Sequence, residues 1–367
     1  MSIRVLVVDD TVVFRRAISE ALAGLPGVEV VGAASNGKLA LARIQALQPD
    51  LLTLDVEMPE MNGIELLESL RTAGLKTGAI MLSSLTRRGG EMTVRALELG
   101  AFDFLPKPET GTPAENVLLL RQQLAPMLRA FERRRDVRTS LGVAPPRVPL
   151  VEAAVEPLSE PTSKPLPRRL SRLGARVVLI GVSTGGPAAL AAVLPSLPSD
   201  LGVPVLVVQH MPPMFTQPLA ESLARKCAIR VKEAEEGELA LPNCAYVAPG
   251  GKHLKVAAGG RGEILLRLTA DPPENGCRPS VDYLFRSAAL QLPGRTVAAI
   301  LTGMGNDGTA GLKLLKRGGC ISIAQDEASC VVFGMPKEAI AAGVVDTVVP
   351  LDQVAGAILR SLRGVRT

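Results

Sequence analysis

Short apolar runs alternate along the chain with longer segments whose apolar residues recur at helical spacing. In the first third, the apolar runs are RVLVVDD, VEVVGAAS, DLLTLDVEMP, AIMLSS and FDFLPKP. Helical spacing appears near residues 14–25, 38–47, 64–72 and 90–99, and a final helical segment follows the fifth run. This regular alternation of strands and helices predicts a doubly wound parallel sheet over residues 1–128.

After residue 133 the composition changes to Pro, Ser, Arg and Glu. Proline lacks an amide donor and interrupts both helices and sheets. It recurs here at Pro145, Pro146, Pro149, Pro157, Pro161, Pro165 and Pro167. We therefore expect residues 129–174 to contain a helix end followed by a flexible linker rich in Pro and Arg.

The alternation resumes after residue 175 and predicts a second domain over residues 175–367. Its apolar runs include RVVLIGV, VPVLVVQH, CAYVAPG, TVAAILTGM and CISIAQ, with helical segments near residues 187–194 and 309–317. The predicted fold class is α/β, with two doubly wound parallel-sheet domains, the first flavodoxin-like and the second Rossmann-like.

Composition agrees with two domains and argues against a nucleic-acid partner. A chain of 367 residues is longer than one hydrophobic core usually serves. Apolar residues make up 47% and aromatic ones only 2%, so the cores must consist of Ala, Val, Leu and Ile, which suits parallel strands covered by helices. Much of the excess positive charge lies in the arginine-rich stretch between residues 121 and 172, without aromatic stacking platforms or a helix-turn-helix pattern.

The cysteines and the N-terminus indicate the cellular compartment. The chain has five cysteines, an odd number with no CxxC pair, which argues against a disulfide framework and a zinc site. The first residues lead directly into a strand-like run without signal-peptide features, and no apolar run is long enough for a transmembrane helix. We expect a cytoplasmic protein with reduced thiols and no membrane insertion.

Polar side chains end four of the predicted strands in the first domain. The first strand ends in Asp9 and Asp10, the third in Asp55, the fourth in Ser83 and the fifth in Lys107. In parallel α/β sheets, ligands bind beyond the carboxyl ends of the strands. Carboxylates gathered there repel one another unless a cation joins them, and hard oxygen donors favour Mg²⁺.

This arrangement predicts phosphoryl transfer to Asp55. A metal beside Asp55 would hold a phosphoryl donor in line, while the Lys107 ammonium and the Ser83 hydroxyl would bind the oxygens of the transferred group. The alternative is that these acids only cap helices of an ordinary flavodoxin-like fold.

A glycine-rich turn in the second domain presents a candidate nucleophile. The run VVLIGVSTGGPAALAAVL places Ser183 between a buried strand and a helix, and GVSTG matches the G-x-S-x-G pattern. Gly181 and Gly185 would allow a sharp turn, and the Thr184 backbone N–H would point at a developing oxyanion. An anion-binding loop without catalytic chemistry is the alternative.

A base and an acid are available at neighbouring strand ends. The chain has two histidines: His210 ends the run VPVLVVQH, and His253 lies in a loop or short strand. The run TVAAILTGMGNDG presents Asp307, which would fix the imidazole tautomer or, alternatively, cap the next helix. We predict attack by Ser183 with His210 as base, and oxyanion stabilisation by Thr184 and the glycine turn after Leu301. The order Ser, His, Asp differs from that of α/β-hydrolases.

The first domain resembles the receiver domain of two-component response regulators. The resemblance rests on DD, LDVEMPEMNG, MLSS and LPKP, and covers about residues 1–125. It implies Mg²⁺ ligation by Asp9 or Asp10, by Asp55 and by the Glu57 backbone carbonyl. It also implies phosphorylation of Asp55 by a histidine kinase.

The same resemblance implies a switch in the receiver. Ser83 and Lys107 correspond to the pair that responds to the phosphoryl group. Receivers usually place a rotameric aromatic on the fifth strand, a position open here to Phe104 or Phe102.

The second domain is similar to the catalytic domain of the CheB chemotaxis methylesterase family. The motifs are GVSTGGP, VQHM, VAPGGKH, PSVDYLF, LTGMGNDG and DEASCVVFGMP, over about residues 175–362. The similarity implies hydrolysis of γ-glutamyl methyl esters on methyl-accepting chemoreceptors and, in many members, deamidation of receptor glutamines, giving adaptation in chemosensory signalling. It also implies a CheA-type kinase as phosphodonor.

This second resemblance implies roles for individual residues. Ser183, His210 and Asp307 form the triad, with no cofactor in this domain, and the Met304 N–H is an oxyanion donor. The unphosphorylated receiver would cover the active site. One departure is Cys277, where the family often has histidine before RPSVD, so substrate contacts or packing near it are expected to differ.

Two other function classes remain open at this point. One is a phosphorylation-responsive adaptor or phosphate sink in the same pathway, without turnover. The other is a serine hydrolase that acts on a small-molecule ester.

Overall fold

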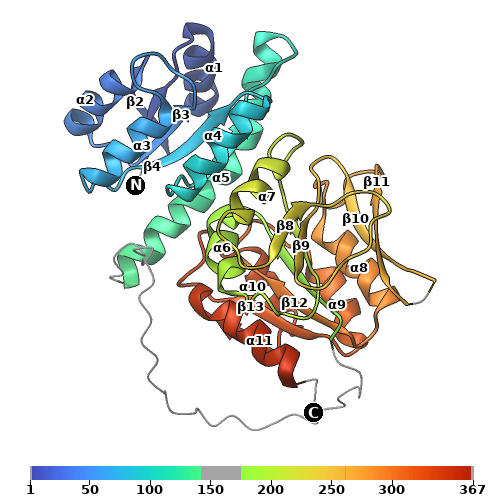
Figure 1. Ribbon diagram of the computed structural model, residues 1–367. Coiled ribbons are helices and arrows are strands. Elements are labelled where there is room, and N and C mark those ends of the chain that lie inside the picture. The colour runs from blue at the N-terminus through green and yellow to red at the C-terminus, as the bar shows by residue number, and fades with distance from the viewer. Residues whose placement is uncertain (1, 142–174, 261, 365–367) are drawn as a thin grey trace.

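Two α/β domains lie side by side in the computed structural model, which describes residues 2–141, 175–260 and 262–364 (Figure 1). Both sheets are parallel and covered by helices, so the predicted fold class is confirmed. The predicted linker lies, from residue 142 onward, outside the described residues, and the domain boundaries stay a prediction. Among the described residues, no helix has both the length and the apolar content needed to cross a membrane.

The N-terminal domain has a five-stranded sheet in the order β2-β1-β3-β4-β5. Its elements are β1 (Ile3–Val8), α1 (Val12–Ala23), β2 (Val28–Ala34), α2 (Gly37–Leu47), β3 (Leu51–Asp55), α3 (Gly63–Thr72), β4 (Gly78–Ser83), α4 (Arg87–Glu98), β5 (Asp103–Pro106) and α5 (Pro113–Leu141). The chain order reverses between β1 and β3. Ligands bind at the carboxyl edge of such a reversal, so the ends of these two strands mark the expected site.

The last helix of this domain extends into the segment that the sequence assigns to a helix end and linker. α5 continues past residue 128 to Leu141 and contains Pro126. Leu128 is buried, and the ring of Phe131 packs edge-on against Phe102 with centroids 5.4 Å apart. These contacts with the sheet explain why the helix persists where the sequence becomes strongly charged.

The C-terminal domain has a seven-stranded sheet in the order β14-β13-β12-β6-β7-β9-β8 and a separate antiparallel hairpin, β10–β11. Its elements are β6 (Val177–Val182), α6 (Gly186–Val193), β7 (Val205–Gln209), α7 (Thr216–Ala224), β8 (Arg230–Glu233), β9 (Cys244–Val247), β10 (His253–Ala258), β11 (Ile264–Thr269), α8 (Val281–Gln291), β12 (Thr296–Ile300), α9 (Thr309–Arg317), β13 (Ile321–Gln325), α10 (Met335–Ala341), β14 (Thr347–Val349) and α11 (Val354–Gly364). Here the chain order reverses between β6 and β12.

The central strand of this second sheet is buried on both faces. Val178 and Ile180 of β6 pack into one hydrophobic cluster, while Val177 and Leu179 pack into another on the opposite face. A strand covered on both sides requires a continuous apolar run, which this segment has. Full burial of each such side chain stabilises the fold by about 1.5–3 kcal/mol.

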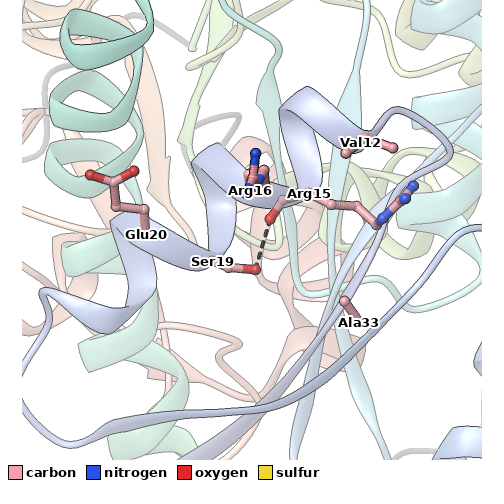
Figure 2. Close-up of a pocket in the computed structure, with 6 residues that line it drawn as sticks. All are labelled: Val12, Arg15, Arg16, Ser19, Glu20 and Ala33. Atoms are coloured by element: carbon pink, nitrogen blue, oxygen red, sulfur yellow. Dashed lines mark hydrogen bonds between the residues drawn. The ribbon is translucent and has the colours of Figure 1, made fainter.

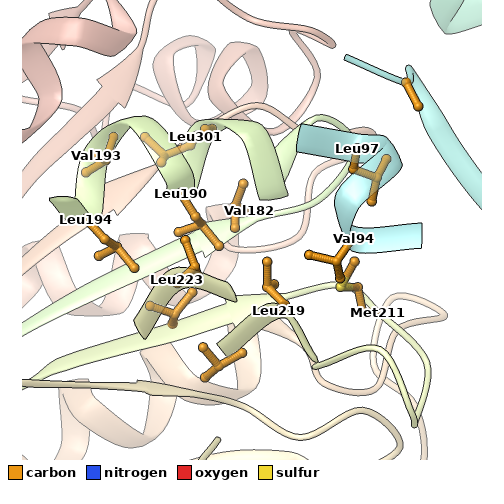
Figure 3. Close-up of a cluster of buried hydrophobic side chains, with 14 of the residues drawn as sticks. Val94, Leu97, Val182, Leu190, Val193, Leu194, Met211, Leu219, Leu223 and Leu301 are labelled. Atoms are coloured by element: carbon orange, nitrogen blue, oxygen red, sulfur yellow. The ribbon is translucent and has the colours of Figure 1, made fainter. Parts of the chain in front are cut away.

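Helix α4 of the N-terminal domain packs against α6 and α7 of the C-terminal domain. Val94 and Leu97 on α4 join the same buried cluster as Leu190 on α6, Leu219 on α7 and Met211 (Figure 3). The two domains therefore share a hydrophobic interface.

Polar contacts accompany this interface. The Glu98 carboxylate accepts a 2.6 Å hydrogen bond from Ser222 Oγ and lies 2.7 Å from Lys226 Nζ. Arg87 Nη2 lies 3.5 Å from Glu221 Oε1. The Arg87–Glu221 pair is exposed and contributes little stability, whereas Glu98 is largely buried at the interface beside the apolar contacts.

Candidate active site and phosphoryl-acceptor site

Three carboxylates meet at the carboxyl edge of the first sheet. Asp9 and Asp10 follow β1 and Asp55 ends β3, so they come from the strands that flank the reversal in chain order. One ligand oxygen of each lies within 4.8 Å of the others. Lys107 Nζ lies 2.8 Å from Asp9 Oδ2 and 2.7 Å from Asp55 Oδ2. The structure thus brings together the acids and the lysine that the sequence singles out.

The chain around Asp55 is shaped by a glycine at the start of α3. The Asn62 side chain accepts a hydrogen bond from Glu65 N, and the Glu65 carboxylate accepts one from Asn62 N, so a capping box begins the helix. A Cβ atom at Gly63 would lie 2.4 Å from the Asp55 carbonyl oxygen. Only glycine permits this close approach of the helix to the strand end.

The electrostatics of Asp55 reflect its burial. Burial raises the pKa of Asp55 to about 6; the hydrogen bond and charge of Lys107 oppose this rise, and the nearby Asp9 adds to it. Burial would lower the pKa of Lys107, but its contacts with the two carboxylates outweigh burial and raise it. A cation near these acids would favour the ionised Asp55.

The donor set fits Mg²⁺, because carboxylate oxygens are the hard ligands that this ion prefers. Asp9, Asp10 and Asp55 supply three such oxygens within reach of one ion. The Glu57 backbone lies beside them, since Glu57 N donates a 3.4 Å hydrogen bond to Asp55 Oδ1. Its carbonyl stays a predicted ligand.

Ser83 bonds to helix α4 and the neighbouring loop. It is buried, and its hydroxyl donates to the carbonyl oxygens of Gly89 at 3.1 Å and Ser84 at 3.3 Å. The two candidate aromatics differ in place: Phe102 packs within its own domain on Phe131, whereas Phe104 packs on Phe215 of the other domain, with centroids 4.7 Å apart.

Ser183 lies in a tight turn between β6 and α6. Ser183 N donates a 3.0 Å hydrogen bond to Thr302 O, which joins it to the segment after β12. Gly185 has φ +77°, and a Cβ atom there would lie 2.4 Å from the Val331 side chain. Gly181 is equally constrained, by Val281. The two glycines are therefore needed for close packing around the candidate nucleophile.

His210 lies beside Ser183 on the next strand. Val182 pairs with Gln209 in the β6–β7 register, so the residues that follow them, Ser183 and His210, leave the sheet at the same level. Gln209 Nε2 donates to the carbonyl oxygens of both, at 3.0 Å and 3.1 Å. His210 Nε2 lies 2.7 Å from Asp307 Oδ2. The three predicted residues thus share one edge of the sheet, with a direct contact between the base and the acid.

Asp307 is surrounded by donors. Its Oδ1 accepts from Ser280 Oγ at 2.9 Å, from Asn275 Nδ2 at 2.9 Å and from Asp282 N at 3.0 Å; its Oδ2 accepts from Val281 N at 2.7 Å. Burial would raise its pKa, but the hydrogen bond and charge of His210 and these backbone donors hold it well below its usual range.

The neighbouring carboxyl, Asp282, behaves differently. Burial raises the pKa of Asp282, and the Asp307 charge adds to this rise. Its Oδ1 accepts a 2.6 Å hydrogen bond from Gly311 N at the start of α9. Sequence reasoning did not single out Asp282, Ser280 or Asn275. The helix-capping position of Ser280 is the available local signal, since its side chain accepts a hydrogen bond from Tyr283 N.

The base itself binds protons strongly in this arrangement. Burial would lower the pKa of His210, but its contacts with Asp307 and Cys277 outweigh burial and raise it to about 9. Cys277 Sγ lies 3.6 Å from Nδ1 of the ring. The sequence marked Cys277 as a departure that affects substrate contacts or packing; the structure places it against the candidate base.

The other histidine has no such position. His253 is fully buried, and its ring stacks on Tyr283 with centroids 4.2 Å apart. Its Nε2 lies 3.0 Å from Pro272 O, and its Nδ1 accepts a 3.2 Å hydrogen bond from Ser280 N. Both ring nitrogens are engaged, so His253 supports the segment that holds Asp307.

The N-terminal domain contacts residues adjacent to the candidate triad. Thr184 Oγ1 donates a 2.6 Å hydrogen bond to Asp103 Oδ2 across the domain boundary. Burial raises the pKa of Asp103 to about 6, against the lowering effect of this hydrogen bond. Met304 also packs on a hydrophobic cluster of the N-terminal domain. Both residues predicted to stabilise an oxyanion therefore contact the receiver-like domain.

The N-terminal domain also contacts the segment that follows His210. A Cβ atom at Gly90 on α4 would lie 2.4 Å from Met214 O, so the helix backbone approaches this segment closely. Met214 has φ +75°, and Phe215 is covered by Phe104. The N-terminal domain thus contacts the chain after the candidate nucleophile and the chain after the candidate base.

A shallow pocket of about 370 Å³ lies on the N-terminal domain, between α1 and β2 (Figure 2). It is lined by Val12, Arg15, Arg16, Ser19, Glu20 and Ala33. The Arg15 guanidinium donates to the carbonyl oxygens of Asp9 and Asp10 at 2.7 Å and 2.8 Å, so this wall of the pocket supports the acidic site.

Comparison with known proteins agrees with this geometry in both domains. Residues 178–358 match the CheB methylesterase family, and residues 5–115 match the response regulator receiver domain. The crystal structure of the Thermotoga maritima CheB methylesterase catalytic domain is 42% identical, with a TM-score of 0.50; the match covers 51% of this chain and 99% of that chain.

Relatives match along nearly the whole length. A protein-glutamate methylesterase/protein-glutamine glutaminase from Desulfotalea psychrophila is 50% identical over 365 residues, with 99% of each chain covered. One of the same name from Bacillus subtilis is 44% identical over 365 residues, with 97% of each covered. With both domains matched in order and half of its residues shared with a full-length relative, the chain belongs to the CheB methylesterase family and carries an N-terminal response regulator receiver domain.

Proposed function

We propose that this chain is a phosphorylation-activated esterase of chemosensory signalling. It removes methyl groups from glutamate γ-methyl esters of methyl-accepting chemoreceptors and deamidates receptor glutamines, in the cytoplasm. The contact of 2.7 Å between His210 Nε2 and Asp307 Oδ2, beside Ser183 on the adjoining strand end, is the observation that carries the proposal. The receiver takes residues 1–128, the linker 129–174 and the catalytic domain 175–367.

In the proposed reaction, Ser183 Oγ attacks the ester carbonyl while His210 takes its proton. Because Nε2 is bound to Asp307, Nδ1 is the nitrogen that receives this proton and then returns it to the departing methanol. Water then hydrolyses the acyl-enzyme by the same steps in reverse order. The backbone N–H groups of Thr184 and Met304 hold the oxyanion. For glutamine, ammonia leaves instead of methanol.

The arrangement described here is a closed, idle state. Burial would lower the pKa of His210, but contacts with Asp307 and Cys277 raise it to about 9 and so favour the protonated ring, whereas a base must be unprotonated. Thr184 and Met304 are engaged by the receiver. The contacts of Thr184 and Met304 with the receiver explain why the receiver must move before turnover.

Phosphorylation of Asp55 by a CheA-type histidine kinase provides that movement. Asp9, Asp10, Asp55 and the Glu57 carbonyl would hold Mg²⁺, which supplies positive charge for the phosphoryl oxygens. Lys107 is already placed 2.7 Å from the acceptor carboxylate. When the Ser83 hydroxyl turns to the phosphoryl group, it leaves the Gly89 carbonyl and so weakens a link to α4, the helix that packs on the catalytic domain.

Methanol release from methylated receptor tests the proposal. Wild type and Ser183→Ala are compared with and without a small phosphodonor; we expect release by wild type, stimulation by the phosphodonor and none above background by the variant. Equal release by both proteins would contradict the catalytic role of Ser183. No release by either, with intact phosphorylation, would indicate the adaptor. Release from a small ester but not from receptor would indicate the small-molecule hydrolase.

A further inference from the structure

A tight turn at residues 274–277 lies against both members of the His210–Asp307 pair. Glu274 N donates to Cys277 O at 3.0 Å, and Cys277 N donates to Glu274 O at 2.9 Å. The two central residues, Asn275 and Gly276, have φ of +54° and +74°. Positive φ at both positions with an Asn-Gly pair is typical of a type I′ turn, which has little conformational freedom. We call this segment the Asn-Gly turn.

The Asn-Gly turn is anchored at two points. Asn275 Nδ2 donates to Asp307 Oδ1 at 2.9 Å and to Asp282 Oδ2 at 3.0 Å. The Glu274 carboxylate accepts two hydrogen bonds from the Arg286 guanidinium on α8, at 2.7 Å and 2.6 Å. The bidentate geometry fixes the direction of the turn. Its last residue, Cys277, is thereby held in a defined place.

Cys277 lies beside Nδ1 of His210, the ring nitrogen that Asp307 does not contact. Cys277 Sγ lies 3.6 Å from His210 Nδ1, while Nε2 is engaged by Asp307. In the protonated ring both nitrogens are donors, so Nε2–H donates to Asp307 and Nδ1–H donates to the Cys277 sulfur, which is a weak acceptor. Cys277 therefore contacts the same nitrogen that must receive the proton of Ser183.

We propose that Cys277 is a positioning residue whose thiol holds Nδ1 of His210 in the resting enzyme and must release this nitrogen before the ring can accept the Ser183 proton. The role in turnover rests on the proposed function, whereas the thiol–imidazole contact does not. In this view the Asn-Gly turn orients both partners: Asn275 fixes the acid, and Cys277 fixes the base.

The charged groups around His210 support this role. Asp307 faces Nε2, Cys277 faces Nδ1, and Asp282 lies behind Asp307, linked to it through Asn275. Burial would lower the pKa of His210, and contacts with Asp307 and then Cys277 raise it. Removal of the thiol takes away one of the two contributions that favour the protonated ring.

The full-length chain offers a direct test, because it contains only two histidines. Histidine-labelled protein is titrated by nuclear magnetic resonance as wild type, Cys277→Ala and Cys227→Ala. Cys227 packs at the edge of a hydrophobic cluster and serves as the matched control. We expect the pKa of His210 to fall by about one pH unit in Cys277→Ala only. The His253 signal reports whether the neighbouring fold is intact.

An unchanged His210 titration in Cys277→Ala, or an equal change in Cys227→Ala, would overturn the proposal. If Cys277→Ala fails to fold, Cys277→Val provides the same comparison, because its side chain fills the space of the thiol without a hydrogen-bonding atom. This test needs no substrate, so its outcome is independent of whether the proposed esterase activity exists.

The pH dependence of methanol release then tests the role in turnover, with phosphodonor present. The base must be unprotonated, so activity rises with pH through its pKa. We expect this rise to occur at lower pH in Cys277→Ala than in wild type and Cys227→Ala. A uniform loss of activity at all pH values, without a shift, would show that Cys277 only supports the local fold and would overturn the positioning role.

Discussion

The Thr184 hydroxyl donates a 2.6 Å hydrogen bond to the Asp103 carboxylate, and so joins the residue after the proposed nucleophile to the receiver. Asp103 begins β5, the strand that leads to Lys107. One short strand therefore connects the phosphoryl-acceptor site with the proposed oxyanion site. The contact gives the closed state a titratable group at its interface.

We predict that the closed state weakens as pH rises. The raised pKa of Asp103, about 6, means that the closed state holds a proton more tightly than an open state in which solvent reaches the carboxyl. The stabilisation of the closed state is complete below pH 3.8, the ordinary pKa of an Asp side chain. It is lost as the pH rises through about 6, the pKa of Asp103 in the closed state. It amounts to at most about 3 kcal/mol.

Small-angle scattering of unphosphorylated protein between about pH 5 and pH 7 measures this effect. The radius of gyration should increase with pH in wild type. In Asp103→Asn, whose side chain stays neutral, that increase should disappear and the closed state should persist at neutral pH. The same pH dependence in both proteins would contradict the assignment.

Gly90→Ala should activate the enzyme without phosphorylation. A Cβ atom at this position would lie 2.4 Å from Met214 O, so the closed packing of α4 is excluded, whereas alanine favours the helix itself by about 1 kcal/mol. Basal methanol release should approach the phosphodonor-stimulated rate. Gly356→Ala on α11, where the nearest atom is the end of the Arg360 side chain, is the control and should keep normal stimulation. Normal repression in Gly90→Ala would show that this contact is dispensable.

Phosphorylation of Asp55 should decline in acid. A protonated carboxyl is a poor nucleophile, and the pKa of about 6 places the decline near that pH when Mg²⁺ is limiting. More Mg²⁺ should move the decline to lower pH, because the ion favours the carboxylate. Lys107→Ala should move it to higher pH, since Lys107 opposes the rise in pKa. The rate of phosphorylation by acetyl phosphate measures both shifts.

Asp55→Asn complements that measurement. It should abolish stimulation of methanol release by the phosphodonor and leave basal release intact, because Asp55 belongs to the receiver and touches no proposed catalytic group. Retained stimulation would exclude Asp55 as the acceptor.

Asp307→Asn should lower kcat by about 10⁴-fold, because an amide cannot hold the imidazole in the productive tautomer. Asp282→Asn is the matched control. Asp282 shares the Asn275 contact with Asp307, but its other oxygen accepts from Gly311 N and not from the imidazole, so a much smaller loss is expected. Similar losses in the two variants would indicate a shared structural defect. Measurements with saturating substrate and phosphodonor separate kcat from KM.

The residues that come together at both sites could be predicted from the sequence, because the ends of parallel strands meet at one edge of the sheet. Asp55 and Lys107, or Ser183, His210 and Asp307, are far apart in the chain, yet each ends or follows an apolar run, and topology brings those ends together. Their catalytic and acceptor roles stay predictions, and the experiments above test them.

Contacts that depend on how loops and domains pack were not accessible. Asp103 reads as an ordinary strand residue, and only docking places it on Thr184. Asn275 and Gly276 form a turn signal, but the sequence does not show that this turn reaches Asp307 and His210. The extension of α5 depends on Phe131 packing against Phe102, a tertiary contact that overrides the linker-like composition.

The receiver reaches the catalytic domain through Asp103, Phe104 and α4, all within one polypeptide, so it acts as an inhibitor tethered to its own target. For such a ligand the effective concentration depends on the tether and not on the amount of protein. The closed fraction should therefore be insensitive to dilution. A receptor helix that competes for the same surface would show an affinity reduced in proportion to the fraction of molecules that are closed. Phosphorylation would then change apparent substrate affinity even if every contact with the substrate were the same.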